Sequence, residues 1–138
     1  MKQLMMIGFG AMANDVCSHL PKDLELKWVV VPERSVDAVK QKVAADVHVI
    51  SKIDDCLGEP DYVIEVAGQA AVKEHALDVL KRGWTIGLIS VGTLADPAFF
   101  EKLQKTGQFL VTKWRLFKLL GNKKILLNIN CIEFGYLF

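Results

Sequence analysis

Near its start the chain reads Ile7-Gly8-Phe9-Gly10-Ala11-Met12-Ala13, directly after a short apolar run at residues 4–7. Each small residue has a role in a turn from strand to helix. Gly8 permits the tight turn, Gly10 leaves room for a pyrophosphate beside the backbone, and Ala13 lets the helix pack close to the strand. Phosphates would lie at the helix N-terminus, where free N–H groups and the dipole favour anions. The stretch therefore predicts the phosphate-binding turn of a dinucleotide-binding βαβ unit.

The position of this turn strengthens the prediction. Small glycine turns occur in many α/β proteins, and methyltransferases use a related one. Here a second apolar run, residues 26–31, arrives at the expected distance and is followed by Glu33, Arg34 and Ser35. We favour a dinucleotide over S-adenosylmethionine because Arg34 and Ser35 replace the clean acidic end that a methyltransferase would show.

Strand-like and helix-like segments alternate up to about residue 108. The strand-like runs are residues 4–7, 26–31, 47–50, 61–66 and 84–89, and the helical segments are residues 11–20, 36–43, 70–82 and 97–104. Several helix ends carry recognisable signals: Ser35 and Asp96 as N-caps, Pro97 at a first helical position, and Gly83 and Gly107 as C-terminal stops. The alternation predicts an α/β fold, a doubly wound parallel sheet of the Rossmann type, over residues 1–108.

The composition fits a compact domain and excludes several function classes. The chain has 138 residues, 51% of them hydrophobic, and a formal net charge of +1, so its overall charge predicts no nucleic-acid partner. No run approaches the ~20 apolar residues of a membrane span, and we expect no membrane association. The cysteines show no disulfide or metal-ligand spacing, so we expect no metal and a reducing, cytoplasmic location; they are Cys17, Cys56 and Cys131.

Residues 109–138 differ sharply from the rest. Residues 1–108 hold 12 Lys or Arg and 15 Asp or Glu, whereas the last thirty hold 5 Lys or Arg and one acidic residue, Glu133, with no Asp, Ala, Ser or Pro. This break predicts a divergent hydrophobic and basic tail, of the kind that a frameshifted or truncated gene would give. A genuine last strand at residues 124–129 stays open, as does a basic amphipathic piece at residues 114–120, which we interpret as a satellite of the core.

Candidate cofactor-binding residues follow from the fold, because ligands of such sheets bind outside the carboxyl ends of the strands. They are the small and polar residues after four of the strand-like runs: Gly8, Gly10, Ala11 and Met12; Glu33, Arg34 and Ser35; Ala67, Gly68 and Gln69; and Ser90, Val91, Gly92 and Thr93.

Residues 33–35 leave the choice between NAD and NADP open. Glu33 lies near the distance from Gly8 at which an acidic residue holds the ribose 2′-OH of NAD, whereas Arg34 and Ser35 would receive the 2′-phosphate of NADP. We favour NADP because its 2′-phosphate would meet two hydrogen-bond donors, Arg34 and Ser35, while the side chain of Glu33 can rotate away from it. The alternative is a solvated loop in which Ser35 caps the next helix.

The remaining polar groups receive structural interpretations. Glu65, at the end of a buried strand-like run, is interpreted as an acceptor for N–H groups of the neighbouring loop. Ser90 and Thr93 either face the nicotinamide or stabilise their own turn. The histidines are interpreted as surface or packing residues, so no catalytic residue is assigned: His19, His48 and His75.

Four segments carry a family resemblance. They are Ile7-Gly8-Phe9-Gly10-Ala11-Met12, Val30-Val31-Pro32-Glu33-Arg34-Ser35, Glu65-Val66-Ala67-Gly68-Gln69-Ala70-Ala71 and Ser90-Val91-Gly92-Thr93-Leu94-Ala95-Asp96. Their order and spacing resemble the N-terminal domain of L-aspartate dehydrogenase over roughly residues 2–108, and the last two are more specific than the glycine turn. The resemblance implies an NAD- or NADP-dependent oxidoreductase. It would convert L-aspartate to iminoaspartate, which hydrolyses to oxaloacetate and ammonia or feeds NAD biosynthesis.

The chain departs from this family after Gln108. The family continues with a Pro-Ser-Gly-Ala-Ile-Gly-Gly-like loop and a second α/β domain that carries substrate contacts and a catalytic His, and residues 109–138 do not resemble them. The resemblance thus implies a chain that binds cofactor but acts on L-aspartate only if a second domain is supplied, and whose uncovered apolar face favours a homo-oligomer. A homoserine-dehydrogenase-like enzyme and a non-catalytic nucleotide-binding or interaction module stay open as alternatives.

Overall fold

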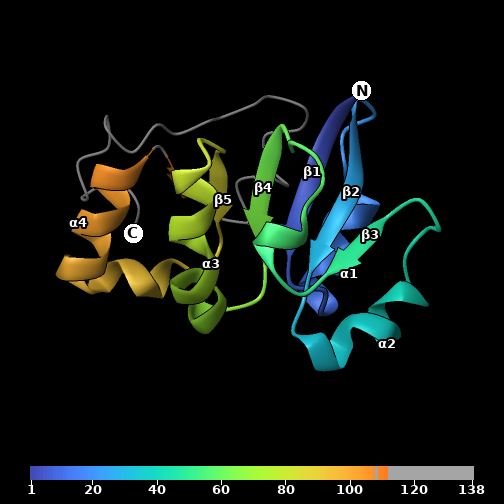
Figure 1. The fold of residues 1–138 in the computed structure, drawn as a ribbon, viewed down its shortest axis with the longest axis horizontal. Coiled ribbons are helices and arrows are strands. Elements are labelled where there is room, and N and C mark those ends of the chain that lie inside the picture. Colours follow the sequence, from blue (N-terminus) through green and yellow to red (C-terminus); the bar gives the residue numbers. More distant parts are fainter. Residues whose placement is uncertain (108, 112–138) are drawn as a thin grey trace.

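A computed structural model describes residues 1–107 and 109–111 of the chain. Within them one parallel sheet has the strand order β3-β2-β1-β4-β5-β6 (Figure 1). The strands are β1 (Lys2–Ile7), β2 (Leu24–Val30), β3 (His48–Ile50), β4 (Tyr62–Glu65), β5 (Ile86–Leu88) and β6 (Phe109–Val111). The helices are α1 (Ala11–Ser18), α2 (Val36–Lys40), α3 (Gln69–Lys81) and α4 (Pro97–Thr106), with short 3₁₀ turns η1 (Glu33–Ser35), η2 (Ile53–Asp55) and η3 (Val91–Ala95).

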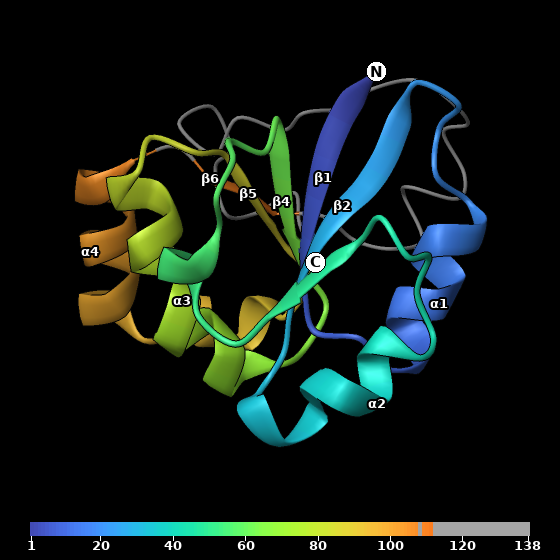
Figure 2. The same cartoon turned by 45° about the vertical axis from the view of Figure 1, so that its right-hand side comes forward.

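The predicted doubly wound sheet is confirmed. Figure 2 shows α1 and α2 on one side of the sheet and α3 and α4 on the other. The chain starts in the middle with β1, moves outward to β2 and β3, and then returns to β4 on the other side of β1. The strand order therefore reverses between β1 and β4, the place where sheets of this kind bind their ligands.

Alternate side chains in residues 4–7 of β1 enter two different cores, which explains why this part of the strand is apolar throughout. Met5 and Ile7 belong to the cluster that contains Val72 of α3, whereas Leu4 and Met6 belong to the cluster that contains residues of α1. A third cluster joins β2 and β3 to α2. A strand buried on both faces needs apolar residues at every position, so the central strand is specified by the sequence itself.

Two small residues of the glycine turn have the packing roles expected of them. Gly8 has a φ of +94°, and a Cβ atom built on it would lie 2.6 Å from the Cβ of Ala67. Ala13 is fully buried between α1 and the sheet. The turn thus needs glycine at Gly8 for both its dihedral angle and its contact with the β4–α3 loop.

The predicted N-cap of α4 agrees with the structure, whereas the predicted N-cap at Ser35 does not. Asp96 caps α4 as predicted, because its carboxylate accepts hydrogen bonds from the N–H groups of Ala98 (3.1 Å) and Phe99 (3.3 Å). The predicted cap by Ser35 is wrong, since its side chain makes no capping hydrogen bond. The reason is its backbone: Ser35 ends η1 with helical dihedral angles, φ −104° and ψ −8°, rather than the extended ones that an N-cap requires.

Several boundaries also differ from the sequence expectation. α2 ends at Lys40 rather than near residue 43, and β5 is shorter than the predicted run at residues 84–89. β6 was not expected, and its parallel pairing with β5 extends the sheet past residue 108. The division of the chain at residue 108 stays a prediction. The segments predicted at residues 114–120 and 124–129 lie outside the described residues.

Candidate cofactor site

Backbone contacts gather the candidate segments at the carboxyl edge of the sheet. The N–H of Gly8 donates to the carbonyl of Val30 at the end of β2 (2.8 Å), and the N–H of Val66 donates to the carbonyl of Ile7 at the end of β1 (2.9 Å). On the other side of β4, a Cβ atom on Gly92 would lie 2.1 Å from Nε2 of Gln69. The segments after β1, β2, β4 and β5 therefore form one continuous rim.

The glycine turn of this rim is open to a ligand. Gly10 is exposed, precedes α1 as its N-cap, and has no protein atom within 4 Å of the position of an added Cβ. The residues after it, Ala11 and Met12, are exposed as well. Because Gly10 has no side chain to cap the helix, the N–H groups of the first turn have no side-chain acceptor. A pyrophosphate fits such a surface by accepting hydrogen bonds from them.

Residues 33–35 form η1, which begins two residues beyond the end of β2, after Val31 and Pro32. Glu33 and Arg34 are exposed, and Ser35 is half-buried, with its N–H donating to the carbonyl of Pro32 (2.8 Å). Both a carboxylate and a guanidinium are thus presented to solvent on the β2 side of the glycine turn. The geometry is compatible with either a ribose hydroxyl or a 2′-phosphate.

Glu65 is a fully buried carboxylate that joins two loops, with an exposed fraction of 0%. Its Oε1 accepts hydrogen bonds from the N–H groups of Ala67 (2.8 Å) and Gly68 (2.7 Å) and from Oγ of Ser90 (2.9 Å). Its Oε2 accepts one from the N–H of Ser90 (3.0 Å). The interpretation of Glu65 as a structural acceptor is confirmed. The sequence did not reveal that Ser90, 25 residues away, supplies two of the donors.

Most of the segment from Ser90 to Thr93 forms the start of the 3₁₀ turn η3 rather than an irregular loop. Thr93 is 2% exposed, and its hydroxyl donates to the carbonyl of Ser90 (3.1 Å). The hydroxyl of Ser90 is directed to Glu65. Both hydroxyl groups therefore make contacts within the protein, as expected if Ser90 and Thr93 stabilise their own turn rather than face the nicotinamide. Val91 is half-buried and packs against the core, whereas Gly92 is exposed and forms the outer surface of the segment.

The histidines and cysteines of the described part lie away from the rim. His19 is the exposed C-cap of α1, His48 begins the edge strand β3, and His75 is half-buried within α3. Burial raises the pKa of the Cys17 thiol, and Cys56 donates to the carbonyl of Gly58 (3.3 Å). Among the described residues no group of three or more His, Cys, Asp or Glu is placed to hold a metal ion.

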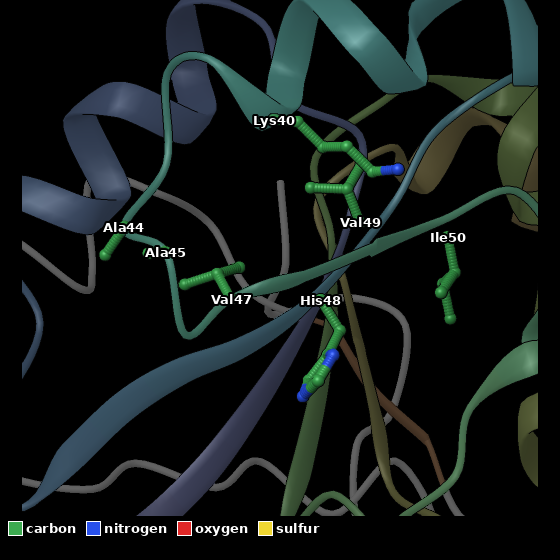
Figure 3. Close-up of a pocket in the computed structure, with 7 residues that line it drawn as sticks. All are labelled: Lys40, Ala44, Ala45, Val47, His48, Val49 and Ile50. Carbon is green, nitrogen blue, oxygen red and sulfur yellow. The ribbon is translucent and has the colours of Figure 1, made fainter.

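A separate hollow of about 420 Å³ lies along the edge strand β3 and includes none of the candidate cofactor residues (Figure 3). Its lining comes from α2, the turn after it and β3: Lys40, Ala44, Ala45, Val47, His48, Val49 and Ile50. It is open and shallow, so the rim remains the better candidate for a dinucleotide. In the described residues, moreover, no helix has the length and apolar character needed to span a membrane.

Comparison with known proteins agrees with this fold. The WlbA dehydrogenase of Bordetella pertussis, solved in complex with NADH and UDP-GlcNAcA, superposes with a TM-score of 0.69 over 83% of this chain and 38% of its own, at 12% identity. Aspartate dehydrogenase of Thermotoga maritima superposes with a TM-score of 0.52 over 80% of this chain and 45% of its own, at 19% identity. At these identities the likeness concerns the fold alone.

Sequence comparison identifies the family. L-aspartate dehydrogenase of Acinetobacter baylyi is 72% identical over 108 residues, which are 78% of this chain and 41% of that protein, so the chain spans about two-fifths of the length of this relative. The predicted resemblance to the NAD-binding region of that enzyme is thereby confirmed. A family model described as the NAD-binding domain of homoserine dehydrogenase matches residues 8–115. This chain, with its glycine turn and parallel sheet, belongs to that family of NAD-binding domains.

Proposed function

We propose that the chain binds NAD or NADP along the carboxyl edge of its sheet, as the cofactor-binding part of an L-aspartate dehydrogenase. The observation that carries the proposal is the open glycine turn at the switch in strand order, where Gly10 leaves the N-terminus of α1 accessible. The 72% identity to an L-aspartate dehydrogenase supports the choice of substrate.

Each segment of the rim has a part of the cofactor to hold. Gly8, Gly10, Ala11 and Met12 would hold the pyrophosphate, and residues 33–35 would contact the adenosine ribose. The nicotinamide end would extend toward two loops: Ala67, Gly68 and Gln69 after β4, and the segment from Ser90 to Thr93 after β5, of which Gly92 is the exposed residue. A bound nicotinamide would supply the acceptor for the hydride of the amino acid's α-carbon. The residues of the rim would bind the cofactor and orient it for that transfer.

The proposal also covers the substrate, the cellular location and self-association of the chain. L-aspartate would be held by groups outside the described residues, and the reaction would take place in the cytoplasm. Self-association into a homo-oligomer remains a prediction. In the described part of the chain, the exposed large apolar side chains that could contribute to such an interface are Met1, Met12 and Leu57. Because the matching family model is named after homoserine dehydrogenase, assays should include L-homoserine beside L-aspartate.

Amide chemical shifts test where the cofactor binds. Adding NADH to isotopically labelled protein is expected to move the signals of Gly8, Gly10, Gly68 and Gly92 at the carboxyl edge of the sheet. The signal of Asp61, which precedes β4 at the opposite edge, should stay in place and serves as the internal control. Shifts confined to the hollow around His48 would contradict the proposed site.

Arg34→Ala is expected to distinguish the two cofactors. An exposed guanidinium beside the ribose would form charge-assisted hydrogen bonds to a 2′-phosphate, so its loss should raise the Kd for NADPH about tenfold and leave that for NADH nearly unchanged. Fluorescence titration of the bound nicotinamide measures both constants. Lys42→Ala removes an exposed cation beyond α2 and is the matched control for net charge. A larger rise in the Kd for NADH than for NADPH would contradict this result. It would indicate instead that the site prefers NAD and that Glu33 contacts its ribose.

A further inference from the structure

We propose that Glu65 is a positioning residue, which locks the β4–α3 and β5–η3 loops together so that they hold the nicotinamide end of the cofactor as one surface. The proposal rests on the proposed function, since it assigns a cause to the geometry of that site. Glu65 does not itself reach the rim, because its side chain is fully buried.

The hydrogen bonds of Glu65 all serve these two loops. Two donors are backbone N–H groups of Ala67 and Gly68, directly after β4, and two are the N–H and the hydroxyl of Ser90, directly after β5. In the described part of the chain no Lys, Arg or His pairs with this carboxylate. Loop donors therefore take the place that a counter-ion has for many buried carboxylates.

The loop that Glu65 holds also has an unusual backbone. Gly68 has a φ of +135° and a ψ of 175°, a conformation that is open essentially to glycine alone, and its N–H points to Oε1 of Glu65. A Cβ on Gly68 would meet no protein atom within 4 Å, so the other side of this residue is open. The hydrogen bond to Glu65 thus helps to keep Gly68 in a conformation that presents bare backbone outward.

The segments after β4 and β5 also contact each other directly, and the β4–α3 loop contacts the glycine turn. Gln69 packs so closely on Gly92 that a Cβ there would lie 2.1 Å from its Nε2, and Gly8 packs against Ala67 in the same way. Glu65 lies in register with Ile7 of β1 and Leu88 of β5. A shift of the β5–η3 loop would therefore open the nicotinamide end of the rim while the phosphate turn stays supported by β1 and β2.

Glu65→Gln separates these two parts of the site. An amide has one acceptor oxygen and one NH₂ donor. The oxygen can replace Oε1, which accepts three bonds, but the NH₂ group then faces the N–H of Ser90 in place of Oε2. Two opposed donors push the β5–η3 loop away from the β4–α3 loop. The size and shape of the buried side chain are almost unchanged.

The test compares NADH with ADP-ribose, which has the same adenosine, phosphates and ribose but lacks the nicotinamide. In Glu65→Gln the Kd for NADH is expected to rise about tenfold, whereas the Kd for ADP-ribose changes less than about twofold. Bound NADH should also become more accessible to quenching by acrylamide. Ser90→Ala removes only the hydroxyl bond, and it is expected to act in the same direction with a smaller effect, which keeps the test available if Glu65→Gln does not fold.

Val79→Ala is the control for a general loss of stability. Val79 is fully buried near the far end of α3, away from the two loops, so this variant should melt at a lower temperature and bind both ligands as the unaltered chain does. Equal losses for NADH and ADP-ribose in Glu65→Gln, or no loss for either, would overturn the positioning role. If the unaltered chain binds neither ligand, the proposed function itself fails.

Discussion

Gly10→Val is expected to raise the Kd for NADH and NADPH by at least about 100-fold, a loss that corresponds to roughly 2.7 kcal/mol or more. A branched side chain at this position would occupy the space that we assign to the pyrophosphate. In the protein alone the substitution is tolerated, because Gly10 has a φ of −97° and no atom lies within 4 Å of its added Cβ. Valine is a poorer N-cap than glycine, so we expect the melting temperature to fall by only a few degrees.

Gly8→Ala is the informative control for this result, because it should act on stability first. Gly8 has a φ of +94°, and its Cβ would lie 2.6 Å from that of Ala67. Strained backbone and overpacking together are expected to cost about 2–4 kcal/mol of folding free energy. Gly10→Val should therefore lose NADH affinity with little change in melting temperature. Gly8→Ala should lower the melting temperature more than it weakens NADH binding. Unchanged NADH affinity in a folded Gly10→Val protein would count decisively against the site.

The second large effect concerns catalysis: the 138-residue chain by itself is expected to bind cofactor and to show no measurable turnover of oxaloacetate, ammonia and NADPH. Hydride transfer requires the amino acid held against the nicotinamide, and proton transfer requires a positioned acid or base. Among the described residues no histidine lies on the rim to serve as such an acid or base.

A parallel assay of L-aspartate dehydrogenase from Acinetobacter baylyi provides the positive control for this prediction. NADPH binding, measured on the same preparation of the chain, excludes unfolding as the cause of inactivity. Turnover of about 1 s⁻¹ or more, within the usual range for enzymes, would show that this chain itself supplies the substrate contacts and the acid or base.

The parts of the fold that depend on local sequence were predictable. Residues 4–7 of β1 are all apolar because both faces of this part of the strand are buried, and Gly8 and Ala13 follow it at the spacing that a strand–turn–helix unit needs. The cap of α4 is equally local, since Asp96 binds N–H groups only two and three residues away.

Contacts between distant segments could not be read in this way. The partnership of Glu65 with Ser90 exists only because β4 and β5 lie side by side, and the close packing of Gln69 on Gly92 depends on the same arrangement. Ser35 shows the opposite error: its residue type suits an N-cap, but as the last residue of η1 it has a helical backbone. Residue type predicts the capacity for an interaction, and the neighbouring strands decide whether it forms.

Titration of the purified chain with NADH, NADPH and S-adenosylmethionine tests the central claim most directly. We expect saturable binding of at least one reduced dinucleotide with a Kd on the order of micromolar, as for a preformed site with several backbone donors, and no binding of S-adenosylmethionine. Binding of S-adenosylmethionine alone, or no saturable signal with either dinucleotide up to about millimolar concentration, would contradict the assignment of the carboxyl edge to NAD or NADP.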